Sequence, residues 1–143
     1  MHNMDNLIII NGPNLNLTGD REPGIYGKIS FEDFLDELRS YFPKINIEYY
    51  QSNVEGEIIN RIHESMLEFN AIILNAGAYT HTSLAIGDAI KAIDIPVVEV
   101  HISNVFSRED FRHKSFIAPN CIGTLSGFGL DSYRLAVEHL VRK

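Results

Sequence analysis

Short apolar runs alternate with amphipathic segments along the chain, and this alternation restricts the fold more than any other feature. Five runs have the length and composition of β-strands, at residues 7–11, 45–51, 71–75, 96–102 and 121–125. A segment with helical features follows each of them, at residues 30–42, 54–69, 83–93, 107–112 and from 131 onward. Because the first and third runs are apolar on both faces, they are typical of parallel strands covered by helices on each side.

This order of segments predicts an α/β fold, a flavodoxin-like doubly wound sheet of five parallel strands with helices on both faces. A closed barrel of eight such units needs about 250 residues, whereas this chain has 143. That length is enough for one unit with its own core. We therefore expect a single domain over residues 1–143, without a repeat or a second domain.

Polar residues mark the predicted helix starts. Ser30 with Asp33 resembles a capping box. Ser52 is expected to cap the helix at 54–69, and Thr82 or Ser83 the helix after it. The expected apolar face of the helix at 54–69 consists of Ile58, Ile59, Ile62, Met66 and Leu67.

Charge and composition exclude several classes of protein. The formal net charge is −7 and no basic stripe stands out, which argues against nucleic-acid binding. A single cysteine, Cys121, excludes an internal disulfide, which indicates a cytoplasmic setting. The thiol itself is interpreted as buried and inert. No apolar segment reaches the roughly 18 residues of a membrane span, and the N-terminus lacks the apolar region of a signal peptide.

A doubly wound sheet places its site beyond the C-terminal ends of the strands, where the strand order reverses. The connection after the first strand, residues 11–30, is much longer than the usual two to six residues. It is interpreted as a lid or binding loop, with a disordered insertion as the alternative. After the third strand, the polar turn at residues 75–83 enters a helix whose N-terminus suits an anion. Helix capping alone gives no role to Asn75 or His81.

A glutamate and a histidine interrupt the fourth apolar run. Side chains two positions apart on a strand share a face, so Glu99 and His101 are expected side by side. Burying an unpaired carboxylate costs several kcal/mol, which makes His101 the expected partner of Glu99. A carboxylate that holds an imidazole favours the protonated ring, a general acid. The alternative is a structural buried ion pair.

Further polar groups follow the same strand and suggest an anionic ligand. Ser103 and Asn104 come directly after it, and Arg108 and Arg112 lie shortly beyond. Two arginines beside polar strand ends suit a carboxylate or a phosphate.

The sequence predicts chemistry without a metal or a cofactor. It lacks GxGxxG, P-loop and GxSxG motifs. His81 and His101 have no further acidic or cysteine residue at a familiar ligand spacing. No lysine stands at a predicted strand end, so no residue is evident that could form an imine with a substrate.

The base that complements His101 is expected on the long loop. Tyr26 is the candidate, although a phenol ordinarily has a pKa near 10. Arg21 lies five residues away, and a guanidinium in a site closed to water stabilises a phenolate. We therefore expect the loop to carry both the base and the group that activates it.

Four sequence motifs together resemble the type II 3-dehydroquinate dehydratases over nearly the whole chain. The motifs are NGPNLN at residues 11–16 with REP at 21–23 and YG at 26–27, NAGAYTHTS at 75–83, EVHISN at 99–104, and REDFR at 108–112. The resemblance implies a flavodoxin-like protomer that converts 3-dehydroquinate to 3-dehydroshikimate in the shikimate/quinate pathway, without metal, cofactor or imine. It also implies a homo-oligomer, commonly a dodecamer.

The resemblance implies a role for each matching residue. Tyr26 removes a proton next to the ketone, and Arg21 keeps Tyr26 ionised. Asn14 helps to stabilise the enolate through a water, and His101, oriented by Glu99, protonates the departing hydroxyl. The matching substrate-binding positions are Asn75, His81, the backbone at Ile102 and Ser103, Arg112, and Asp88, which is reached from a neighbouring subunit.

Some positions differ from the family pattern, and two other functions remain open. The differences are at Thr18, Gly87, Phe106 and Ser107, which we expect in loops or on the surface. One open function is a non-catalytic flavodoxin-like binding module, although the first loop holds Pro13 and asparagines rather than a phosphate cradle. The other is a different lyase or isomerase acting on a sugar acid.

Overall fold

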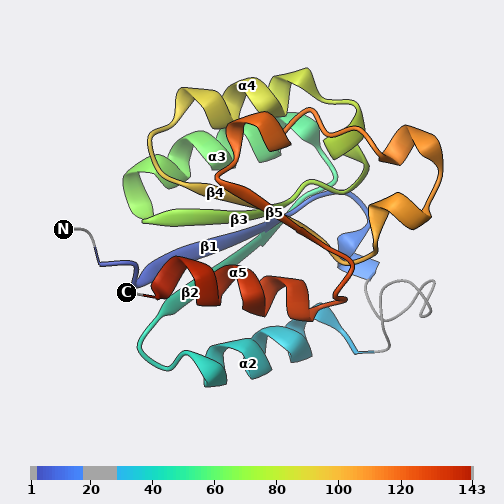
Figure 1. Cartoon of the computed structure of the whole chain (residues 1–143). Coiled ribbons are helices and arrows are strands. Elements are labelled where there is room, and N and C mark those ends of the chain that lie inside the picture. The colour runs from blue at the N-terminus through green and yellow to red at the C-terminus, as the bar shows by residue number, and fades with distance from the viewer. Residues whose placement is uncertain (1–2, 18–28, 143) are drawn as a thin grey trace.

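Five parallel strands form one sheet in the computed structural model, which describes residues 3–17 and 29–142. The strands lie in the order β2-β1-β3-β4-β5, as Figure 1 shows. Their bounds are Asn6–Asn11 (β1), Asn46–Gln51 (β2), Ala71–Asn75 (β3), Val97–His101 (β4) and Gly123–Ser126 (β5). The predicted parallel sheet is confirmed, and its order reverses between β1 and β3, where a doubly wound fold places its site.

Two helices cover each face of the sheet (Figure 1). Helices α2 (Phe31–Tyr41) and α5 (Asp131–Val141) lie on one face, and α3 (Glu55–Glu68) and α4 (Leu84–Ala92) on the other. Instead of the one helical piece expected at 107–112, two short 3-10 helices follow β4, Val105–Ser107 (η3) and Asp110–Arg112 (η4). The remaining 3-10 helices are Leu15–Leu17 (η1), Gly77–His81 (η2) and Ala118–Asn120 (η5).

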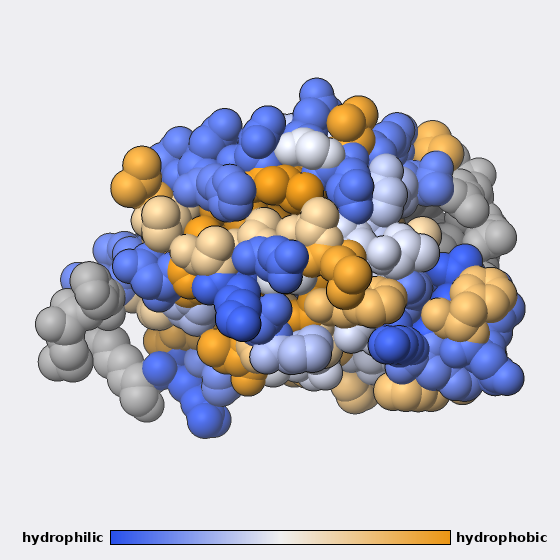
Figure 2. Space-filling view, turned by 90° about the horizontal axis from the view of Figure 1, so that it is seen from above, coloured by the Kyte–Doolittle hydropathy of each residue, from blue (hydrophilic) through white to orange (hydrophobic). Residues whose placement is uncertain are grey.

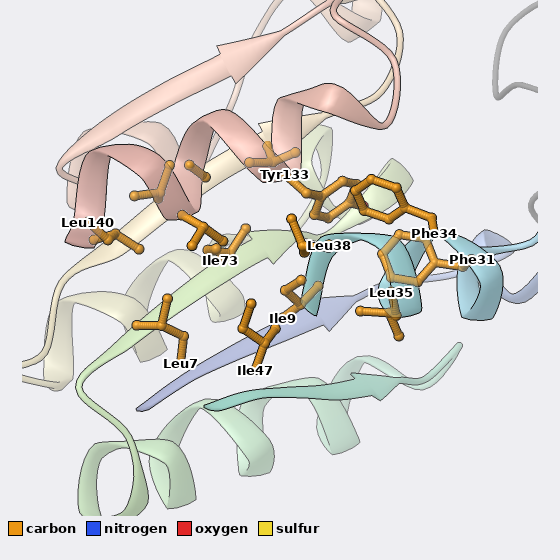
Figure 3. Packing of buried hydrophobic residues seen from close by; sticks show 14 of the residues in the cluster. Leu7, Ile9, Phe31, Phe34, Leu35, Leu38, Ile47, Ile73, Tyr133 and Leu140 are labelled. Carbon is orange, nitrogen blue, oxygen red and sulfur yellow. The ribbon is translucent and has the colours of Figure 1, made fainter. Parts of the chain in front are cut away.

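The alternation of side chains along the strands divides the core into two layers. In β1, Leu7 and Ile9 pack toward α2 and α5, whereas Ile8 and Ile10 pack toward α3 and α4. Figure 3 shows the first layer, with Leu7 and Ile9 on β1 and Tyr133 reaching in from α5. No helix within the described ranges is long and apolar enough to cross a bilayer.

Two of the predicted helix caps are confirmed and one is wrong. Ser30 Oγ accepts the Asp33 N–H at 3.1 Å, and Ser83 Oγ accepts the Ile86 N–H at 2.9 Å. Ser52 does not cap α3, because its Oγ accepts the N–H of Val54, the residue before the helix. The chain therefore turns at Ser52 before the helix begins.

The expected apolar face of α3 is wrong at one residue. Leu67 is 86% exposed, whereas Ile58 and Ile62 are fully buried. Nine positions separate Leu67 from Ile58, which places Leu67 on the opposite side of the helix. Ser65 is buried in its place, with its hydroxyl bonded to the Arg61 carbonyl. Figure 2 views the molecule from the side of α3 and α4, where apolar side chains lie among polar ones on the surface.

Among the positions that differ from the family pattern, Gly87 does not lie on the surface as expected. Phe106 and Ser107 are exposed, and Thr18 lies outside the described residues. Gly87 is buried on α4, because the segment before η5 packs against it. A Cβ on Gly87 would lie 2.5 Å from the Phe116 carbonyl oxygen.

Gly12 brings the ends of β1 and β3 into close contact. Its N–H donates to the Asn75 carbonyl oxygen at 2.7 Å, and an added Cβ would lie 2.6 Å from the Ala76 carbonyl carbon. Since the three nearest atoms all belong to the Ala76 backbone, no flexible side chain can move aside to relieve the clash. The crevice beyond β1 and β3 therefore depends on a residue without a side chain.

We expect Gly12→Ala to lower the free energy of unfolding by about 1–3 kcal/mol, the usual cost of overpacking. Urea denaturation measures the change. Gly56→Ala is the matched control, since Gly56 lies in the first turn of α3 with no atom within 4 Å of the added Cβ. That control should be neutral or stabilising by up to about 1 kcal/mol. Equal stability of the two variants would show that the strand ends can separate freely.

Candidate active site

A cavity of about 270 Å³ opens at the C-terminal ends of β1, β3 and β4. Its walls come from the turn after β1, the η2 turn after β3, and the segment that contains η3 and η4. Of the residues predicted from the sequence, those that line it are Asn14, Asn75, His81, His101, Ile102, Ser103, Arg108 and Arg112. The topology thus brings together groups from three distant parts of the chain.

Glu99 and His101 form a buried pair on β4. Glu99 is 3% exposed and His101 is 7% exposed. The Glu99 Oε2 bonds to His101 Nε2, and the other carboxylate oxygen accepts the Ser115 hydroxyl at 3.0 Å. With Glu99 ionised, Nε2 carries the proton, which leaves His101 Nδ1 as the nitrogen that can exchange a proton with a ligand. The predicted pairing is confirmed, and Ser115 is a contact that the sequence analysis missed.

His81 lies beside His101 in the cavity wall. The two rings are nearly parallel, with centroids 6.1 Å apart. The His81 Nδ1 donates to the Lys114 carbonyl oxygen at 2.7 Å, because a carbonyl can only accept. Burial lowers the pKa of His81, and the nearby His101 and Arg112 lower it further. His81 is therefore suited to remain neutral near pH 7, with Nε2 as an acceptor.

The lowered pKa of His81 makes stability depend on pH. The folded protein binds this proton less readily than the unfolded chain, whose histidine pKa is 6.5. The free energy of unfolding should therefore decline as the pH falls below about 6.5. We expect His81→Gln to remove part of this decline, as measured by urea denaturation at about pH 7.5 and pH 5.5. His63→Gln, on the exposed side of α3, should retain it. An undiminished decline in His81→Gln would contradict the assignment.

Two arginines and a glutamate form the charged wall of the cavity. Arg112 Nε lies 3.3 Å from both carboxylate oxygens of Glu109, and Arg108 Nε lies 3.8 Å from one of them. The Glu109 backbone N–H lowers the pKa of that carboxyl, and Arg112 adds to the effect. An anionic ligand at this wall would compete with Glu109 for the guanidinium groups.

Asn14 has a left-handed backbone in the turn after β1. Its φ is +69°, the one positive φ outside glycine within residues 3–17 and 29–142. Asn53 holds this conformation from the β2–α3 connection, because its Oδ1 accepts the Asn14 N–H at 3.0 Å. Asparagine tolerates such a conformation better than most residues, which explains its presence at this position.

The end of β4 is also held in place. The Ile102 carbonyl accepts the Gly129 N–H at 3.0 Å, and the Ser103 carbonyl accepts the Ser126 hydroxyl at 3.2 Å. Both contacts come from the end of β5 and the segment that precedes α5. They fix the backbone of Ile102 and Ser103 where it borders the cavity.

Not all of the predicted site residues are among the described residues that line this cavity. Glu99 does not line it and contacts it through His101. Asp88 is exposed on α4 and does not line the cavity. Tyr26 and Arg21 lie outside the described residues, so their proposed roles stay predictions.

Burial raises the pKa of the Cys121 thiol to about 12, which agrees with an inert thiol. Among the described side chains, no three His, Cys, Asp or Glu residues cluster in a way that could hold a metal ion.

The fold and the cavity define a class: a flavodoxin-like α/β protein with an imidazole–carboxylate pair and two arginines at its strand ends. The family model "Dehydroquinase class II" matches residues 5–141. The chain is 55% identical over 140 residues to a 3-dehydroquinate dehydratase of Caldicellulosiruptor bescii, covering 96% of this chain and 97% of that protein. The chain therefore belongs to the class II dehydroquinase family.

Two solved structures of that family have the same fold. The type II dehydroquinase of Butyrivibrio crossotus superposes with a TM-score of 0.91 at 45% identity, covering 94% of this chain and 96% of the other. The enzyme from Propionibacterium acnes gives a TM-score of 0.92 at 35% identity, covering 99% of both chains. Both superpositions cover nearly the whole chain.

Proposed function

We propose that the protein is a hydro-lyase of the shikimate pathway that removes water from 3-dehydroquinate to give 3-dehydroshikimate. The family match over residues 5–141 and the name of the relative with 55% identity support this activity. The structural observation that carries the proposal is the Glu99–His101 pair at the edge of a cavity with two arginines. An acid, and a site for an anion, are what the elimination of water from a carboxylated hydroxy ketone requires.

His101 acts in this proposal as the general acid. In the elimination, a proton leaves the carbon next to the ketone, and the hydroxyl on the following carbon then departs. Protonation of that hydroxyl turns hydroxide into water, a much better leaving group. Glu99 supports the cationic ring, and Ser115 keeps the carboxylate facing it. His101 Nδ1 is then the atom that donates the proton.

Tyr26 is proposed as the base, activated by Arg21. The phenols of Tyr49 and Tyr133 are unsuited, since burial raises the pKa of Tyr49 to about 12 and raises the pKa of Tyr133 as well. A base needs the opposite shift, which a neighbouring guanidinium supplies by stabilising the phenolate. Arg21 is five positions from Tyr26 in the same loop.

The remaining cavity residues are proposed to bind the substrate and the enolate. Arg112, which lines the cavity, is proposed to bind the substrate carboxylate, because a guanidinium binds a carboxylate with two parallel hydrogen bonds. Asn75, neutral His81 and the backbone of Ile102 and Ser103 supply polar contacts for the hydroxyl groups. Asn14, through a water, is proposed to stabilise the developing enolate.

We also propose that the protein is a homo-oligomer, a dodecamer in the family pattern, in which Asp88 reaches the cavity of a neighbouring subunit. The exposure of Asp88 on α4, outside the cavity of its own chain, supports this arrangement. Light scattering after size-exclusion chromatography gives the mass of the particle. A monomeric particle with full activity would contradict the proposal.

The proposed activity is tested directly by the absorbance of the conjugated enone in the product. We expect absorbance to rise when purified protein is added to 3-dehydroquinate without metal or nucleotide, and an excess of chelator should leave the rate unchanged. Substrate without protein is the control. No increase in absorbance at high protein concentration would refute the dehydratase assignment.

A further inference from the structure

A chain of hydrogen bonds crosses the protein interior beneath the cavity. The Tyr133 hydroxyl on α5 donates to Asn11 Oδ1 at 2.8 Å and accepts from Asn75 Nδ2 at 2.9 Å. Tyr133 and Asn11 are fully buried, and Asn75 is 3% exposed. The three residues come from α5, β1 and β3, so the contact joins the C-terminal helix to both strands at the reversal point.

The directions of these bonds fix the orientation of the Asn75 carboxamide. Its Oδ1 accepts the Gly77 N–H at 3.1 Å, and its Nδ2 donates one hydrogen to Tyr133. A carboxamide nitrogen carries two hydrogens, so one remains for another acceptor. Asn75 lines the cavity, and a ligand oxygen there is the acceptor that this second hydrogen suits.

Aromatic packing holds the Tyr133 hydroxyl in place. The Tyr133 ring meets the Phe31 ring edge-on with centroids 5.1 Å apart, and the Phe34 ring lies 5.9 Å away. Figure 3 shows Tyr133 reaching from α5 toward these two side chains of α2. Burial raises the pKa of Tyr133, so its hydroxyl stays protonated and continues to donate to Asn11.

We propose that Tyr133 is a positioning residue that sets the Asn75 carboxamide so that its nitrogen donates to an oxygen of the bound substrate. Without the hydroxyl, Asn75 loses the acceptor that holds its nitrogen, and its side chain can rotate away from the ligand. This inference rests on the proposed function only for the identity of the ligand. The geometry of Asn75 is a separate observable.

Tyr133→Phe tests the proposal because it removes one oxygen and keeps the buried ring. We expect KM for 3-dehydroquinate to rise by about three- to tenfold, the effect of one lost hydrogen bond, with a smaller change in kcat. A purely structural role would lower the unfolding temperature and leave KM unchanged in assays well below that temperature. An unchanged KM would therefore overturn the proposal.

Tyr49→Phe is the matched control in the same network. The Tyr49 hydroxyl accepts a hydrogen from Asn11 Nδ2 at 3.4 Å, whereas the described hydrogen bonds of the Asn75 side chain go to Tyr133 and Gly77. The KM of the Tyr49→Phe variant should stay at the wild-type value.

A double-mutant cycle tests whether Tyr133 acts through Asn75. In an Asn75→Ala background, Tyr133→Phe should raise KM no further. Additive effects would overturn the proposal, since Tyr133 would then act by another route.

A crystal structure of the Tyr133→Phe variant separates this inference from the proposed function. We expect the Asn75 carboxamide to adopt a new rotamer or to lose its single orientation, whether or not the protein turns over 3-dehydroquinate. If the wild-type protein is inactive on 3-dehydroquinate, the proposed function fails while this measurement still decides the role of Tyr133. An Asn75 side chain in its original position would overturn the proposal.

Discussion

His101→Asn is expected to lower kcat by about 10²- to 10⁴-fold, the usual contribution of general acid catalysis. Asparagine keeps a hydrogen-bonding side chain beside Glu99 but has no proton to give at neutral pH. Because Glu99 is 3% exposed, the substitution also removes the imidazole ring that pairs with its carboxylate. We therefore expect some loss of stability as well, and kcat should be measured on protein shown to be folded by circular dichroism.

Two comparisons separate catalysis from folding in this experiment. His63→Asn, on the exposed side of α3, should retain wild-type kcat. Glu99→Gln keeps a hydrogen bond to His101 but removes the charge that favours the protonated ring, so its kcat should lie between wild type and His101→Asn. A folded His101→Asn protein with near-normal kcat would rule out His101 as the acid and leave a structural ion pair as the role of the two residues.

The sheet and its helices could be predicted because their signals are local. Each signal is contained in a short segment of the sequence. Examples are the apolar runs that form β1 and β3, and the helical spacing of Phe31, Phe34 and Leu38. The error at Gly87 arises where tertiary packing decides, whereas the error at Leu67 concerns helix geometry alone. Gly87 is buried because a segment about 30 positions away packs on α4, and no local pattern contains that contact.

The same distinction applies to the site. Glu99 and His101 could be found because a charged residue and a histidine interrupt an apolar strand, and the fold rule then placed them at a strand end. Ser115 and Tyr133 could not be found, since their partners are 16 and 58 positions away in the chain. Tyr133 left one weak signal, a phenol on the buried face of α5, but Ser132 places a second hydroxyl on the same face.

Tyr26→Phe is expected to lower kcat by about 10²- to 10⁴-fold, because it removes the proposed base. The segment that contains Tyr26 continues from Leu17, just beyond the cavity-lining residues Pro13, Asn14 and Leu15. Phenylalanine keeps the ring and removes only the oxygen that takes the proton. Since the loss falls on the chemical step, KM should change much less than kcat, and the unfolding midpoint in urea should remain at the wild-type value.

Arg21→Gln provides the decisive control, because Arg21 is proposed to act only by keeping Tyr26 ionised. Without the guanidinium, the pKa of the phenol returns toward its ordinary value near 10. The Arg21→Gln variant should therefore be slow near neutral pH and should gain rate as the pH rises, because the phenolate then forms without help. Tyr26→Phe has no group to ionise and should stay slow over the same range. If both variants respond to pH in the same way, the activating pair is excluded and the base must be another residue.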